Sequence, residues 1–145
     1  MATRPVFHGT HRSFLEVVKT NGLMPPPGHG VGVRVRLGYD QAMDDAKAWA
    51  AFMVWKERLT PVGMIAVCFV PEDGITDVRG TLRVKDGIPP SELHVRGPFD
   101  FTDLFFHDVG RPTEDFWRFR EAWDVLTAQP RRTFTQGLMP GMATV

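Results

Sequence analysis

The segment Gly63–Val70 limits the possible folds of this chain more than any other feature, because it is an uninterrupted apolar run. A run of this length suits a β-strand that is covered on both faces better than it suits a helix. It is also far too short to cross a bilayer. We therefore expect a buried strand here, with other elements packed over both of its faces.

The composition is that of a soluble globular protein of about one-domain size. Of the 145 residues, 43% are hydrophobic and 23% are charged, which argues against disorder of the whole chain. The 17 basic and 17 acidic side chains balance, which argues against nucleic-acid binding through bulk charge. We expect residues 1–130 to form one domain and residues 131–145 to form a C-terminal tail that could pack on it. Because Met1–Val6 contains no apolar signal region, we expect a cytoplasmic location and no membrane partner.

Cysteine and histidine give no sign of a disulfide or a metal site. Cys68 is the only cysteine, so it has no partner for an internal disulfide. The histidines do not combine with it at the spacing of a zinc site. We expect no metal cofactor, and we expect Cys68 to be a small buried hydrophobic residue.

The N-terminal third predicts a strand followed by a helix. The first strand should cover Arg4–His8. Ser13 then stands where it could cap a helix, with Glu16 three residues later as in a capping box. Gly22 is a good helix stop because glycine tolerates the left-handed cap conformation, and Leu23 should return to the core.

The next segment predicts a second strand and a longer helix. Val31–Leu37 alternates valine with arginine or glycine over most of its length, which is the two-residue period of a strand. Asp40 then caps a helix that should extend to about Leu59. One face of this helix carries small residues, so it can pack close to a sheet; they are Ala42, Ala46 and Ala50.

The remainder of the chain predicts mostly strands and a terminal helix. Short strands are expected over Gly80–Val84, Leu93–Val95 and Phe101–His107, and Thr113 should cap the last helix. The order is then strand, helix, strand, helix, several strands and a helix, which defines an α+β fold class.

The segment Phe7-His8-Gly9-Thr10 carries the most chemical information. Gly9 has no side chain, so a ligand can reach its backbone N–H and C=O, and a flat carboxamide can pair with both. The side chains of His8 and Thr10 offer hydrogen bonds suited to ribose hydroxyls. The alternative is a strand that ends in histidine at a tight glycine turn, without any ligand.

The N-terminal part of the chain has a fixed order of features. It begins with an aromatic residue and His-Gly-Thr, continues with a helix that ends in Gly-Leu, and then has a strand and a helix rich in small residues. This pattern resembles the ADP-ribosyltransferase superfamily, and within it the compact bacterial rifamycin ADP-ribosyltransferases. RNA 2′-phosphotransferases and DNA-modifying toxin transferases share the His-Gly-Thr opening. The resemblance is specific over Pro5–Leu23, fair over Val31–Ala51 and weak over Gly63–Val95.

This resemblance implies a fold, a substrate and a set of binding residues. The fold would be a single-domain ADP-ribosyltransferase-like split β-sheet core with flanking helices. The substrate would be NAD+, used without a metal and held by His8, Gly9 and Thr10.

In this superfamily an aromatic residue at the end of the second strand stacks on nicotinamide. Strict alignment puts Arg36 at that place, and Tyr39, the only tyrosine, lies three residues on. Either Tyr39 supplies the ring from a shifted position, or Arg36 contacts phosphate or ribose instead, as an arginine can.

The resemblance also implies a catalytic carboxylate, because breaking the nicotinamide–ribose bond builds positive charge on the ribose. The compact antibiotic-modifying members resemble this chain over Phe69–Asp77, where a buried strand runs into an acidic loop that contains glycine. The resemblance makes Asp77 the matching acid, with Asp73 or Glu72 as the fallbacks. Other members carry a glutamate at the start of the fifth strand, which falls near Thr81 here and is not an acid. Glu92 is the other nearby candidate.

The sequence therefore predicts an NAD+-dependent ADP-ribosyltransferase, for example a toxin or a resistance factor. It leaves the acceptor open among a protein, a nucleic acid and a small molecule. Arg36 and Ile88–Leu93 resemble the RNA 2′-phosphotransferases, although the neutral charge counts against that activity. A third alternative is a degenerate module that binds NAD+ or ADP-ribose without turnover, which the displaced tyrosine and the missing fifth-strand glutamate favour.

Overall fold

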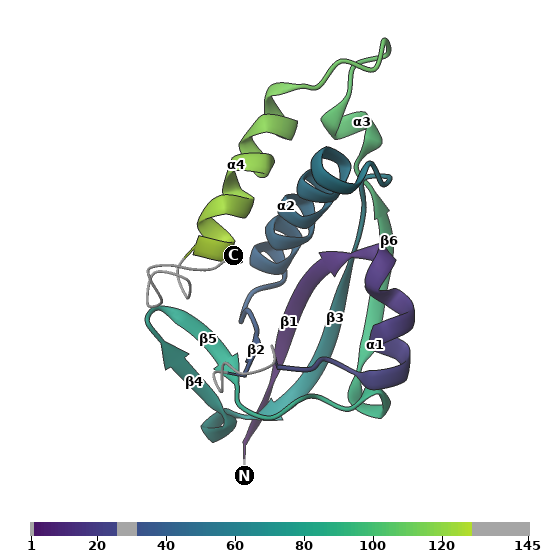
Figure 1. The fold of residues 1–145 in the computed structure, drawn as a ribbon. Helices are drawn as coiled ribbons and strands as arrows, with labels where there is room; N and C mark the ends of the chain where they lie inside the picture. Colours follow the sequence, from purple (N-terminus) through teal and green to yellow (C-terminus); the bar gives the residue numbers. More distant parts are fainter. Residues whose placement is uncertain (1, 26–31, 129–145) are drawn as a thin grey trace.

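Two antiparallel sheets of three strands organise the residues that the computed structural model describes, 2–25 and 32–128 (Figure 1). The first sheet has the order β1-β3-β6, with bounds Thr3–His11, Val62–Pro71 and His94–Asp100. The second has the order β2-β5-β4, with bounds Val33–Arg34, Thr81–Val84 and Ile75–Val78. The chain is α+β, as predicted.

Helix α2 packs on the first sheet against β1 and β3, and α4 packs along α2 (Figure 1). Their bounds are Leu15–Asn21 for α1, Tyr39–Glu57 for α2, Thr102–Phe105 for α3 and Glu114–Ala128 for α4. Short 3-10 turns cover Arg12–Phe14, Glu72–Gly74 and Pro90–Glu92. Within the described ranges, no helix is long and apolar enough to cross a membrane.

Strand β3 confirms the buried apolar run. It lies between β1 and β6, and Met64, Ile65 and Ala66 are at most 1% exposed. The prediction fails at the end of the strand, where Phe69 is 62% exposed. The part of β3 that is buried on both faces is therefore the part that pairs with β1 on one side and with β6 on the other.

Helix α2 approaches the first sheet closely through the small residues that the sequence singled out. Ala42, Ala46 and Ala50 are fully buried. The opposite face of β1 and β3 contributes to a second core together with α1 and β2, and its members include Val6, Val18, Val33, Met64 and Cys68. The first sheet is thus covered on both sides, which confirms the layered arrangement.

The first strand and first helix differ from their predicted bounds. Strand β1 continues through His11, so His8-Gly9-Thr10 lies within the strand and makes no turn. Ser13 does not cap α1, which begins at Leu15 after a 3-10 turn. The His11 ring caps the 3-10 turn instead: its Nε2 donates to the Thr60 carbonyl at 2.7 Å, and its Nδ1 accepts the Ser13 N–H at 3.0 Å.

Helix α2 begins at the predicted place with a different cap. Gly38, and not Asp40, is the N-cap residue, and the Gln41 side chain accepts the Gly38 N–H at 3.3 Å. Asp40 lies in the first turn, where its negative charge favours the positive end of the helix dipole. The helix ends at Glu57, two residues before the predicted end.

Two further segments were predicted wrongly. Phe101–His107 was expected as a strand, but Thr102–Phe105 forms the short helix α3. The Asp100 carboxylate accepts from the Thr102 N–H at 2.9 Å and from its hydroxyl at 2.6 Å, which turns the chain into a helix. Of the acidic segment after Phe69, expected as a loop, Glu72–Gly74 forms a 3-10 turn and Ile75–Val78 forms strand β4.

The terminal helix is confirmed. The Thr113 hydroxyl accepts the Phe116 N–H at 3.2 Å, as a cap does, and Phe116 and Phe119 are buried against α2 and α3. The predicted tail, residues 131–145, and the first residue of the predicted second strand, Val31, lie outside the described residues.

Candidate functional site

Gly9 presents a backbone donor and acceptor on the side of β1 that faces away from β3. The Phe7 N–H donates to the Arg36 carbonyl at 2.9 Å, and the Arg36 N–H donates back at 2.8 Å. The β1–β3 register has no break, so the backbone groups of Gly9 point in the same direction as those of Phe7. Among the described residues, no hydrogen bond outside strand pairing reaches Gly9. The pair has the direction needed to receive a carboxamide in the plane of the sheet, and Gly9 itself is buried in this structure.

The missing side chain of Gly9 has a second role that the sequence did not reveal. A Cβ atom here would lie 1.9 Å from the Ala42 carbonyl oxygen and 2.8 Å from the Ala46 nitrogen. Helix α2 therefore packs directly on this glycine. The residue is required for the fold, whether or not a ligand uses its backbone.

His8 projects to the other face of β1, because successive side chains of a strand alternate. Its Nδ1 donates to the Arg34 carbonyl at 2.7 Å, which leaves Nε2 as an acceptor in the neutral ring. Burial lowers the pKa of His8, and the hydrogen bond to Arg34 only partly opposes that shift. Thr10 lies on the same face and is 4% exposed. His8 is therefore a neutral imidazole with a fixed orientation.

Arg36 and Tyr39 lie on the α2 side of β1, away from His8. Arg36 is opposite Phe7 in an antiparallel bridge, so the two side chains share a face. The Arg36 Nε and Nη2 donate to the two Asp45 carboxylate oxygens at 2.7 and 2.9 Å, which raises the pKa of Arg36. The Tyr39 ring meets Phe7 edge to face at 5.7 Å. The five predicted binding residues are thus divided between two faces of one strand.

Asp45 is the partner that the sequence analysis missed. It is 8% exposed and belongs to α2. Its position gave a usable signal, since it follows Ala42 by three residues and directly precedes Ala46 on the buried face of the helix. An acid on such a face is seldom buried without a partner.

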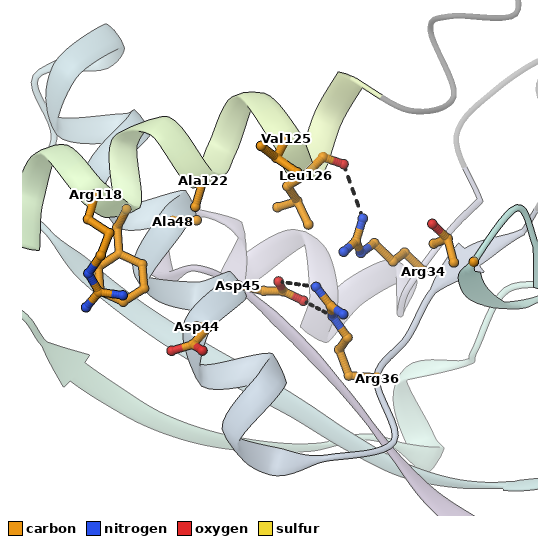
Figure 2. A pocket seen from close by; sticks show the side chains of 12 residues that line it. Arg34, Arg36, Asp44, Asp45, Ala48, Arg118, Ala122, Val125 and Leu126 are labelled. Carbon is orange, nitrogen blue, oxygen red and sulfur yellow. Dashed lines mark hydrogen bonds and ion pairs between the residues drawn. The ribbon is translucent and has the colours of Figure 1, made fainter.

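A pocket of about 450 Å³ lies on the α2 side, between α2, α4, β2 and the β4–β5 turn (Figure 2). Its polar lining includes Arg34, Arg36, Asp45 and Thr81. Neither Asp77 nor Glu92 lines this pocket, so the predicted acids and Arg36 do not meet there.

Asp77 lies in an exposed hairpin. Its carboxylate accepts the Gly80 N–H at 2.7 Å. Arg79 and Gly80 both have positive φ, 57° and 83°, as a tight two-residue hairpin turn requires. One oxygen of Asp77 is therefore engaged in holding the turn between β4 and β5.

Glu92 lies beside the first sheet. It is exposed in the Pro90–Glu92 turn, which contacts α1. Burial raises the pKa of the Cys68 thiol to about 11, and the Glu92 carboxylate adds to the rise. Cys68 is directly opposite Val6 and shares the face of β1 and β3 that carries His8. The pKa of His8, on the same face, responds instead to the charges of Asp45, Arg34 and Arg83.

Comparisons with models of protein families, with curated proteins and with solved structures find no match to this chain. The family resemblance of the sequence therefore stays a prediction. Within residues 2–25 and 32–128, no three His, Cys, Asp or Glu side chains are grouped so that they could hold a metal ion.

The two buried histidines of β1 are expected to make the protein acid-sensitive. Burial lowers the pKa of both His8 and His11 below 6.5. The unfolded chain then binds more protons between each folded pKa and 6.5, so the free energy of unfolding falls as the pH is lowered through that window. Denaturant titrations from about pH 8 to about pH 5 measure this slope. His8→Gln and His11→Gln should each make it shallower, and an unchanged slope in both variants would contradict the prediction.

Proposed function

We propose that this protein is an ADP-ribosyltransferase that uses NAD+. The observation that carries the proposal is the backbone edge of Gly9. A carboxamide such as that of nicotinamide has one donor and one acceptor group in a plane, and it complements the Gly9 N–H and C=O. The sequence context of Gly9, between His8 and Thr10, supports the same ligand.

His8 supports the proposal through its fixed tautomer. With Nδ1 committed to the Arg34 carbonyl, Nε2 is an acceptor for a ribose hydroxyl. The lowered pKa keeps the ring neutral near pH 7, which is the state in which Nε2 can accept. In this proposal Arg36 is a positioning residue that ties β1 to α2 through Asp45.

The proposed reaction breaks the bond between the nicotinamide nitrogen and the ribose carbon. The electron pair of that bond stays with nicotinamide, and an acceptor nucleophile then bonds the same ribose carbon and loses a proton. A carboxylate stabilises the positive charge that develops on the ribose. Of the two predicted acids, Glu92 is preferred for this role, because the Asp77 carboxylate is engaged in the hairpin turn.

A binding module for NAD+ or ADP-ribose without turnover is the second candidate. Two observations favour it: Thr81, at the start of β5, is not an acid, and Asp77 holds a hairpin turn. Nicotinamide release separates this candidate from a transferase.

The first experiment combines thermal shift with product analysis. NAD+ at about 100 times its dissociation constant should stabilise the folded protein by about 2.7 kcal/mol. His8→Ala should lose this stabilisation and stay folded, and His94→Ala, an exposed histidine of β6, is the matched control. Nicotinamide release by the wild type supports the transferase, and binding without release supports the module. No thermal shift with millimolar NAD+ would overturn both.

A further inference from the structure

Arg34 extends from β2 into the pocket between α2 and α4, where its charge has little compensation (Figure 2). Its Nη1 donates to the Leu126 carbonyl at 3.2 Å. Its Nε is buried and has no hydrogen-bond partner in the described part of the chain. Among the same residues, no carboxylate forms an ion pair with it.

The residues outside the described ranges contain no acidic side chain that could pair with Arg34. Residues 26–31 and 129–145 contain no aspartate or glutamate. Asp45 is the acid whose charge acts on the pKa of Arg34, but both of its carboxylate oxygens already accept hydrogen bonds from Arg36. Burial lowers the pKa of Arg34 to about 10, and the charge of Asp45 only partly opposes this. The end of α4 near Leu126 supplies only about half a negative charge.

The pocket has a polar wall and an apolar wall. Two of its three arginines already have carboxylate partners, Arg36 with Asp45 and Arg118 with Asp115, so Arg34 is the lining arginine without an ion pair among the described residues. The apolar wall belongs mainly to α4, with Phe119, Ala122 and Val125. A volume of about 450 Å³ is in the range of small-molecule sites.

We propose that this pocket binds a small phosphorylated molecule of about mononucleotide size. Arg34 is the main ligand of the phosphate group, because an arginine fork binds phosphate oxygens through charge-assisted hydrogen bonds. The Nη2 of Arg34, which makes no hydrogen bond within the described residues, can donate to the phosphate oxygens together with Nη1. The apolar wall of α4 receives the rest of the molecule. This site is additional to the proposed NAD+ site, since it lies on the face of β1 and β2 opposite to His8.

The test uses inorganic pyrophosphate and adenosine monophosphate as probes in calorimetry with the full chain. Both should bind the wild type. Arg34→Gln should weaken both by about tenfold or more, since charge-assisted hydrogen bonds are lost. Ala122→Trp, which fills the pocket from α4, should weaken adenosine monophosphate without removing the cation. Arg96→Gln, an exposed arginine of β6, is the matched control and should bind as the wild type does.

Three outcomes would overturn the proposal. The first is that neither probe binds the wild type. The second is that Arg34→Gln and Ala122→Trp, with melting curves that show them folded, bind both probes normally. The third is that NAD+ displaces pyrophosphate competitively, which would merge this pocket with the NAD+ site. If the two probes bind and NAD+ does not, the result supports the phosphate pocket. It then contradicts only the proposed transferase function.

Discussion

Gly9→Ala is expected to lower the free energy of unfolding by about 3 kcal/mol or more, near the upper end for overpacked cores. The added Cβ would lie 1.9 Å from the Ala42 carbonyl oxygen, and this atom belongs to the backbone of α2. A flexible side chain could move aside, but here the whole helix has to shift. For a chain of this length the melting temperature should fall by about 10 °C. Denaturant titration and thermal melts measure both quantities.

Gly74→Ala is the matched control for this prediction. A Cβ at Gly74 has no heavy atom within 4 Å, so the same substitution adds no clash there. We expect a change within about 0.5 kcal/mol of the wild type. Equal stability of the two variants would mean that α2 does not pack on Gly9 as described.

The elements with a strong period or a fixed chemistry were predictable from the sequence. The buried strand around Ile65, the small face of α2 and the threonine cap of α4 follow from residue type alone. Gly22 ends α1 and has a φ of 75°, as its predicted role requires. These features depend mainly on residues that are close to one another in the sequence.

The elements that failed depend on longer-range or competing hydrogen bonds. Ser13 lies inside a 3-10 turn and does not cap α1, because the turn is capped by His11, whose ring is held by Thr60, 49 residues away. Asp100 started a helix where the run of phenylalanines favoured a strand. Neither contact leaves a periodic trace in the sequence.

The candidate site was predictable in its residues and not in its geometry. The sequence identified the motif around Gly9, but the division between the His8 face and the Arg36 face depends on the pairing of β1 with Arg36. The partner of Arg36, Asp45, is nine residues on and becomes its neighbour only when α2 folds back. Pairing and packing of this kind need the three-dimensional structure.

Glu92→Gln is expected to reduce the turnover number for nicotinamide release by about 10²–10³-fold. The carboxylate acts when the ribose becomes cationic, so its loss should change the dissociation constant of NAD+ by about twofold at most. The amide keeps the size of the side chain and removes its charge. Because Glu92 is exposed, the variant should also fold as the wild type does. Steady-state kinetics and calorimetry measure the two constants separately.

Asp77→Asn is the control that separates the two predicted acids. Asparagine can still accept the Gly80 N–H through its carbonyl oxygen, so the hairpin between β4 and β5 should persist. If Asp77 only holds this turn, nicotinamide release should be close to the wild-type rate. The reverse result, with Asp77→Asn inactive and Glu92→Gln active, would assign the charge stabilisation to the hairpin. In that case the reacting ribose would lie at the second sheet, and Gly9 would not be the residue that holds nicotinamide.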